Sequence, residues 1–155
     1  MARSESDRLW PPLYAGKVIQ VPTLEYAEAR KIVDAIAAEV LGRGKAAVIT
    51  VADPHGELIA FARLDGAPLS SIQISLNKAW TAARERKPTK QIGEAARDPE
   101  KGFDIAYFGD PRFVGWGGGL PIWKHGQVVG AVAVSGLPQA EDIELATMGA
   151  ALIAD

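Results

Sequence analysis

The sequence contains no cysteine and only two histidines. Without thiols the chain has no disulfide, no thiolate nucleophile, no zinc–thiolate site and no cysteine-ligated iron–sulfur cluster. His55 and His125 each precede a glycine in an expected turn, where a polar residue tolerates the geometry. Neither has a second histidine at a spacing typical of metal ligands. The sequence therefore predicts no metal site.

An excess of positive charge and a long apolar run are also missing. The formal net charge is −2, which argues against a sequence-independent nucleic-acid binder. No apolar stretch approaches the roughly 18–20 residues that span a bilayer, and residues 1–12 lack the apolar centre of a secretion signal. We expect neither nucleic acid nor a membrane as a partner, and a cytoplasmic location.

A chain of 155 residues fits one domain with one core. Residues 1–16 are charged and then proline-rich, and are interpreted as an N-terminal extension. Residues 17–155 are interpreted as a single domain. Hydrophobic content of 48% and charged content of 23% are ordinary for a globular protein.

Hydrophobic periodicity predicts an α+β fold, in which helices pack on a central antiparallel β-sheet. The helices are expected from a cap at Thr23 to Leu41, from a cap at Ser70 or Ser71 to about Arg86, over 89–97, and from Pro138 onward. The strands are expected at 17–21, 46–52, 57–64, 120–124 and 127–135, and residues 98–115 form a long irregular stretch.

A run of glycines, Gly117–Gly119, follows Trp116 and precedes an expected strand. In a P-loop the glycines instead lead into a helix, whose N-terminus binds phosphate. A Lys and a Ser or Thr follow the glycines of a P-loop, and this chain has neither directly after its run. This run is therefore either the wall of a pocket or a device for close packing.

Three charged side chains are candidate catalytic residues. Arg63 and Asp65 are two residues apart at the end of an expected strand, so both side chains could lie on the same face. An arginine there could bind a carboxylate through two hydrogen bonds. Lys78 lies in the second long helix, three residues before Thr81, and burial would lower the pKa of its ammonium group. The alternative for Arg63 and Asp65 is an ordinary ion pair at the strand end, and the alternative for Lys78 is a solvent-exposed surface lysine.

The first turns of the last helix carry three acidic side chains, Glu141, Asp142 and Glu144. The helix dipole favours acids at this position, and the three are also the best cluster of oxygen ligands for a hard cation.

Five segments together resemble the GlcG/HbpS family, which includes the C-terminal domain of some PduO-type corrinoid adenosyltransferases. In order they are Val51–Leu58, Phe61–Pro68, Lys78–Ala82, Gly117–Pro121 and Gly130–Gly136. The likeness covers about residues 22–154. It implies a profilin-like α+β fold, homo-oligomers from dimer to octamer, and haem binding or haem degradation.

The chain departs from the family pattern in three places. Asp53–Gly56 stands where the family usually has Asp-Ala/Gly-Gly, Trp80 replaces a tyrosine, and Leu137–Asp142 replaces a second glycine followed by Glu-Gln-Asp. Haem iron needs an axial ligand, and His55 or Tyr107 are the candidates, within one subunit or across an interface.

Two functional hypotheses follow. The first is an enzyme without redox metal or other cofactor, of isomerase, lyase or hydrolase type, acting on a small carboxylate or oxygenated ring compound. Arg63 would bind the carboxylate, Asp65 or Lys78 would move protons, and the Gly117–Gly119 amides would stabilise an oxyanion. Trp80, Thr81 and Trp116 would line the substrate site, so that Arg63, Lys78 and the glycines share one concavity. The alternative is a haem- or tetrapyrrole-binding protein for storage, sensing or delivery.

Overall fold

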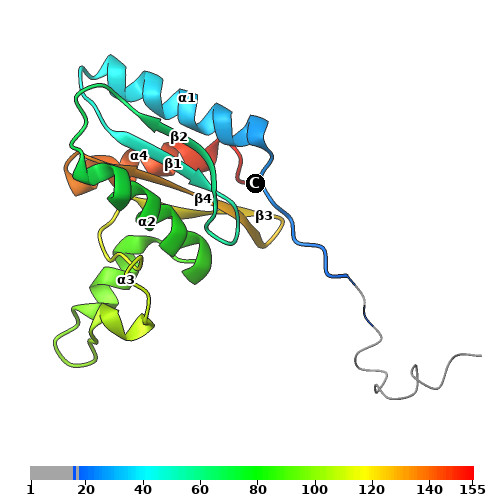
Figure 1. Ribbon diagram of the computed structural model, residues 1–155, viewed down its shortest axis with the longest axis vertical. Helices are drawn as coiled ribbons and strands as arrows, with labels where there is room; N and C mark the ends of the chain where they lie inside the picture. Colours follow the sequence, from blue (N-terminus) through cyan, green and yellow to red (C-terminus); the bar gives the residue numbers. More distant parts are fainter. Residues whose placement is uncertain (1–15, 17) are drawn as a thin grey trace, which may run out of the picture.

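The computed structural model describes residue 16 and residues 18–155 of the chain. Four strands form one antiparallel sheet in the order β2-β1-β4-β3, and four α-helices pack against it (Figure 1). The predicted α+β class with a central antiparallel sheet is confirmed. The elements are α1 (Tyr26–Gly42), β1 (Val48–Ala52), β2 (Leu58–Arg63), α2 (Ser70–Glu85), α3 (Thr89–Ala96), a 3₁₀ turn (Ile105–Phe108), β3 (Gly119–Lys124), β4 (Gln127–Ser135) and α4 (Gln139–Ala151).

Two hairpins make the sheet, and their central strands join them. Strand β1 pairs with β2 on one side and with β4 on the other, and β4 pairs with β3. Because Ala52 lies opposite Ala131 in this register, both hairpin turns lie at the same end of the sheet. Val48 lies opposite Ser135 at the other end, where β4 leads into α4.

The two faces of the sheet carry different kinds of side chain. Helices α1 and α4 cover one face over large aliphatic residues, including Ile36, Val51, Val132 and Leu145. Burying each such side chain contributes about 1.5–3 kcal/mol to folding. Helix α2 covers the other face mainly through alanines, in two clusters that include Ala79, Ala82, Ala131 and Ala133. Small side chains let α2 lie close to the strands.

Two predictions at the N-terminal side are wrong. Residues 18–21 form no strand, because they are exposed and pair with no strand of the sheet; Lys17 and residues 1–15 lie outside the described residues. Glu25, and not Thr23, occupies the N-cap position of α1, and no side chain there makes a capping hydrogen bond; the Thr23 hydroxyl donates to the Leu24 carbonyl at 3.5 Å.

The expected cap of α2 is also wrong, with a consequence for the site. The capping position belongs to Leu69, and no side chain caps this helix. The hydroxyls of Ser70 and Ser71 are therefore left for other contacts.

No helix in the described part of the chain has the length and apolar character that crossing a bilayer requires.

Candidate functional site

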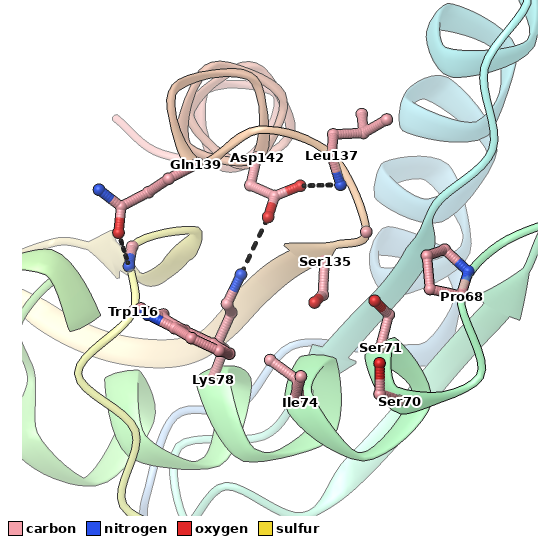
Figure 2. Close-up of a pocket in the computed structure, with 12 residues that line it drawn as sticks. Pro68, Ser70, Ser71, Ile74, Lys78, Trp116, Ser135, Leu137, Gln139 and Asp142 are labelled. Atoms are coloured by element: carbon pink, nitrogen blue, oxygen red, sulfur yellow. Dashed lines mark hydrogen bonds and ion pairs between the residues drawn. The ribbon is translucent and has the colours of Figure 1, made fainter.

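A cavity of about 550 Å³ opens at the end of the sheet where β4 leads into α4 (Figure 2). The start of α2, the end of β4, the start of α4 and the loop before β3 form its walls. Its size lies within the usual range for small-molecule sites. The lining residues are Pro68, Ser70, Ser71, Ile74, Lys78, Trp116, Gly117, Ser135, Gly136, Leu137, Gln139 and Asp142.

A buried ion pair forms the floor of this cavity. The Lys78 Nζ lies 3.0 Å from Asp142 Oδ2 and donates a second hydrogen bond to the Val134 carbonyl at 2.9 Å. Asp142 Oδ1 accepts a hydrogen bond from the Leu137 backbone amide at 3.2 Å. Lys78 is 2% exposed and Asp142 is 3% exposed. Helices α2 and α4 cover opposite faces of the sheet. The ion pair therefore links the two helical layers, at the edge of the sheet next to the first residues of β3.

Burial moves the pKa of both partners toward the neutral forms. Loss of solvent lowers the pKa of Lys78, and the nearby Asp142 charge offsets part of that change. Loss of solvent also raises the pKa of Asp142, which the Lys78 ammonium group partly offsets. Groups with shifted pKa values beside a cavity are typical of sites that bind ligands or transfer protons.

The glycines before β3 allow the chain to approach Lys78. Gly118 has a φ of +118°, and a Cβ at this position would lie 2.7 Å from the Val134 carbonyl oxygen and 2.9 Å from the Lys78 Nζ. A Cβ at Gly119 would lie 2.6 Å from the Lys78 carbonyl oxygen. Gly117 lines the cavity, and its amide donates to the Gln139 Oε1 at 2.9 Å. The run therefore combines the two predicted roles, pocket wall and close packing.

The structure brings some of the predicted site residues together. Lys78, Trp116 and Gly117 line the cavity, and Gly118 and Gly119 are buried immediately beside Lys78. Trp116 is 60% exposed and lies at the mouth of the cavity.

Arg63 and Asp65 are placed elsewhere. Arg63 is exposed at the end of the edge strand β2, Asp65 is exposed in the turn that follows, and neither lines the cavity. The concavity that contains Lys78 and Gly117 thus lacks the guanidinium group expected there. The catalytic roles of Arg63 and Asp65 stay predictions.

Trp80 and Thr81 hold the long irregular stretch against α2. The Thr81 hydroxyl donates to the Arg112 carbonyl and accepts from the Val114 amide, both at 3.1 Å. The Trp80 ring meets Phe113 edge to face, and the Arg84 and Arg112 guanidinium groups lie over it. Neither residue lines the cavity of Lys78, and their predicted role in substrate binding stays a prediction.

Sequence reasoning did not identify Ser71, Ser135 or Gln139 as site residues, and it considered Asp142 only as a first-turn acid and as part of an oxygen cluster for a cation. The first-turn acidic side chains of α4 are each paired, because Glu141 contacts Lys45 at 2.6 Å and Glu144 contacts Arg43 at 2.7 Å. Asp142 differs from them only in facing the buried Lys78. The one available signal was the position of Asp142 one helical turn after Pro138, on the inner face of a helix.

A second cleft, of about 370 Å³, lies at the opposite end of the sheet between the two hairpin turns and residues 20–22. The His55 side chain, 66% exposed, lines it, and the ring makes no hydrogen bond within the described residues. Its Nδ1 lies 3.9 Å from Asp53 Oδ2. The other lining residues are Gln20, Val21, Pro22, Pro54, Arg86, Trp123, Gly126, Gln127 and Val128.

The other candidate haem ligands are less well placed. His125 lines a neighbouring hollow, and its Nδ1 lies 3.3 Å from the carboxylate of Asp155. Tyr107 is 81% exposed on the 3₁₀ turn and lines neither the Lys78 cavity nor the His55 cleft.

Comparisons with known proteins agree with the resemblance read from the sequence. A family model described as "Haem degrading protein HbpS-like" matches residues 24–151. An uncharacterized 15.0 kDa protein of the dhaT-dhaS intergenic region of Citrobacter freundii is 36% identical over 121 residues, covering 78% of this chain and 85% of that protein. The crystal structure of Klebsiella pneumoniae protein ORFY superposes with a TM-score of 0.81 at 33% identity, covering 89% of this chain and 95% of that one.

A solved structure described as a PduOC:Heme complex superposes with a TM-score of 0.78. It covers 84% of this chain and 95% of that chain at 23% identity, a level that supports a common fold alone. Because the family model matches residues 24–151, the predicted resemblance is confirmed, and the chain belongs to the HbpS-like family.

Proposed function

We propose that the protein binds haem or a related tetrapyrrole, with the imidazole of His55 as the axial ligand. The observation that carries this proposal is the His55 ring, which makes no hydrogen bond within the described residues and lies at the edge of a cleft with both apolar and polar walls. Support also comes from the family, whose model is named for haem degradation, and from a relative of the same fold whose structure contains haem.

The residues of this cleft fit the group chemically. Haem iron takes an imidazole nitrogen, its macrocycle needs apolar contacts, and its carboxylates pair with cations. The cleft offers His55, the exposed Trp123 and Val21, and the guanidinium group of Arg86. The Asp53 carboxylate beside Nδ1 would orient the ring and leave Nε2 for the iron. Bound haem would supply an iron centre for storage, sensing or delivery.

The cavity of Lys78 fits haem iron less well. It contains no histidine, tyrosine or methionine, and its lysine already donates to Val134 and Asp142. We therefore assign the tetrapyrrole to the His55 cleft alone.

Titration with haemin tests the proposal through the Soret band. We expect saturable one-to-one binding by the unmodified protein, and at least tenfold weaker binding by His55→Ala, because an axial ligand is lost. His125→Ala is the matched control, since this second histidine also lies in a hairpin turn and is held by Asp155. No Soret change with the unmodified protein, or equal binding by His55→Ala, would refute the assignment.

A second candidate function is acid–base chemistry on a small molecule at Lys78. The buried Lys78–Asp142 pair on the floor of a cavity favours it, because such a pair can hold or release a proton beside a ligand. In this function Asp142 takes the role in proton transfer that sequence analysis assigns to Asp65.

A further inference from the structure

The cavity of Lys78 presents hydroxyl groups that have no hydrogen-bond partner among the residues that the structure describes. Ser71 is 3% exposed and Ser135 is 4% exposed, yet neither hydroxyl makes a hydrogen bond within the described residues. Among the described side chains, only the Trp80 indole nitrogen is sealed from solvent without a partner, so both hydroxyls reach the cavity. Figure 2 shows them pointing into the same space, with Ser70 beside them. Buried polar groups normally have hydrogen-bond partners, so this arrangement calls for a ligand or water.

Two helices begin at this cavity. Ser70 is the first residue of α2 and Gln139 is the first residue of α4, and both line the wall. The backbone amides of Ser70, Gln139 and Ala140 donate no hydrogen bond within the described part of the chain. The N-terminus of a helix carries a partial positive charge and unused N–H groups, which together favour an anion.

The charged groups at the cavity leave this preference intact. The Asp142 carboxylate is balanced by Lys78, whose ammonium group has three N–H donors and uses two of them on Asp142 and Val134. The nearby Glu141 is balanced by Lys45. The Gln139 oxygen accepts from the Gly117 amide, which leaves the Gln139 amide nitrogen as a donor. Lys78 and Gln139 therefore each keep an N–H donor that the hydrogen bonds of the described residues do not use.

The remaining walls are apolar. Pro68, Ile74, Trp116 and Leu137 face the same space, and a volume of about 550 Å³ has room for an organic body beside the charged end. We propose that this cavity binds a small organic anion, whose carboxylate or phosphate group lies against Ser71, Ser135 and the starts of α2 and α4. The body of the ligand contacts Ile74 and Trp116.

This inference shares only its site, the cavity of Lys78, with the second candidate function, the acid–base chemistry. Binding of the anion is measured without turnover, so a protein that binds but catalyses nothing would refute the acid–base function and leave the site intact. It is also independent of haem, because the His55 cleft lies at the other end of the sheet.

Calorimetric titration with three probes of similar shape tests the site. Benzoate carries a carboxylate, phenyl phosphate carries a phosphate, and benzamide is neutral. We expect at least one of the two anions to bind saturably, and benzamide to bind at least tenfold more weakly. The stronger anion distinguishes a carboxylate ligand from a phosphate ligand. Absence of saturable binding by both anions, or equal binding of benzamide, would overturn the proposal.

Paired serine variants test the location. The double variant Ser71→Ala/Ser135→Ala should weaken binding of the stronger anion at least tenfold, because two donors are removed. Ser75→Ala is the matched control: this buried serine lies one turn further along α2 but contacts the Thr50 hydroxyl at 2.8 Å, away from the cavity. Far-UV circular dichroism establishes that each variant is folded. Unchanged affinity in the folded double variant, or an equal loss in Ser75→Ala, would place the anion elsewhere.

Discussion

Replacing Lys78 by methionine is expected to lower the free energy of unfolding by about 3–5 kcal/mol, the usual cost of removing one partner of a buried ion pair. Methionine fills a similar volume but leaves the Asp142 carboxylate 3% exposed without its cation. Urea denaturation followed by tryptophan fluorescence measures the change.

The double variant Lys78→Met/Asp142→Asn is the control for this prediction. Asparagine keeps an oxygen that can accept from the Leu137 amide but carries no charge. We expect it to recover most of the stability lost in Lys78→Met. A double variant that is no more stable than Lys78→Met would show that the loss comes from packing and not from an uncompensated charge.

The pH dependence of Lys78→Met gives a further expected result. Burial raises the pKa of Asp142 in the folded protein, and loss of the Lys78 charge removes the main influence that opposes this rise. The folded state therefore binds more protons than the unfolded state between the ordinary and the raised pKa, and stability falls as pH rises through that range. We expect the loss in free energy of unfolding of Lys78→Met, relative to the unmodified protein, to be smaller at pH 5 than at pH 8. A deficit that stays constant would contradict a charged carboxylate at this position.

Substituting Gly118 by alanine should have the second large effect, a loss of about 2–5 kcal/mol. Over-packing contributes about 1–3 kcal/mol, and an L-residue in the left-handed region contributes about 1–2 kcal/mol. The added methyl group would meet the Val134 carbonyl and the Lys78 Nζ, neither of which can move freely. Because the methyl group displaces Lys78, anion binding at the cavity should weaken with stability. Thermal unfolding and titration with the stronger of the two anions measure the two effects.

Gly126→Ala separates the two causes. Gly126 also has a positive φ, of +74°, but an added Cβ there meets nothing within 4 Å. We expect this variant to show only the backbone cost of about 1–2 kcal/mol and unchanged anion binding. Equal losses in the two variants would mean that contact with Lys78 and Val134 contributes nothing.

Much of the fold could be predicted from local sequence patterns. The strand at 127–135 coincides with prediction, and α2 begins within two residues of its expected start, because apolar periodicity and turn residues act over short distances. The expected strand at 17–21 was wrong for a tertiary reason. Residues 18–21 have a suitable pattern but lie where no strand offers a ladder of hydrogen bonds.

The site was predicted only in part. Lys78 and the glycines were identified from residue type and spacing, and the structure places Lys78 and Gly117 in one cavity. Strand parity pairs Arg63 with Asp65 on one face, but it carries no information on which cavity that face meets, so the expected convergence of Arg63 with Lys78 and the glycines had no local signal behind it. Sequence analysis groups Asp142 with Glu141 and Glu144, as first-turn acids or as a cation cluster, because residue type alone does not show which of the three meets a buried cation.

The amino-acid sequence by itself determined the family, the α+β class and the order of the elements from α1 onward, because these follow from patterns within short segments. The tertiary structure alone decided which charges meet. Lys78 and Asp142 lie 64 positions apart on helices of opposite layers, and they pair only because glycines before β3 let those layers approach. It also left the serines at the start of α2 free to face the cavity, since the capping position belongs to Leu69. Such contacts depend on how close packed elements come, a distance that local periodicity does not encode.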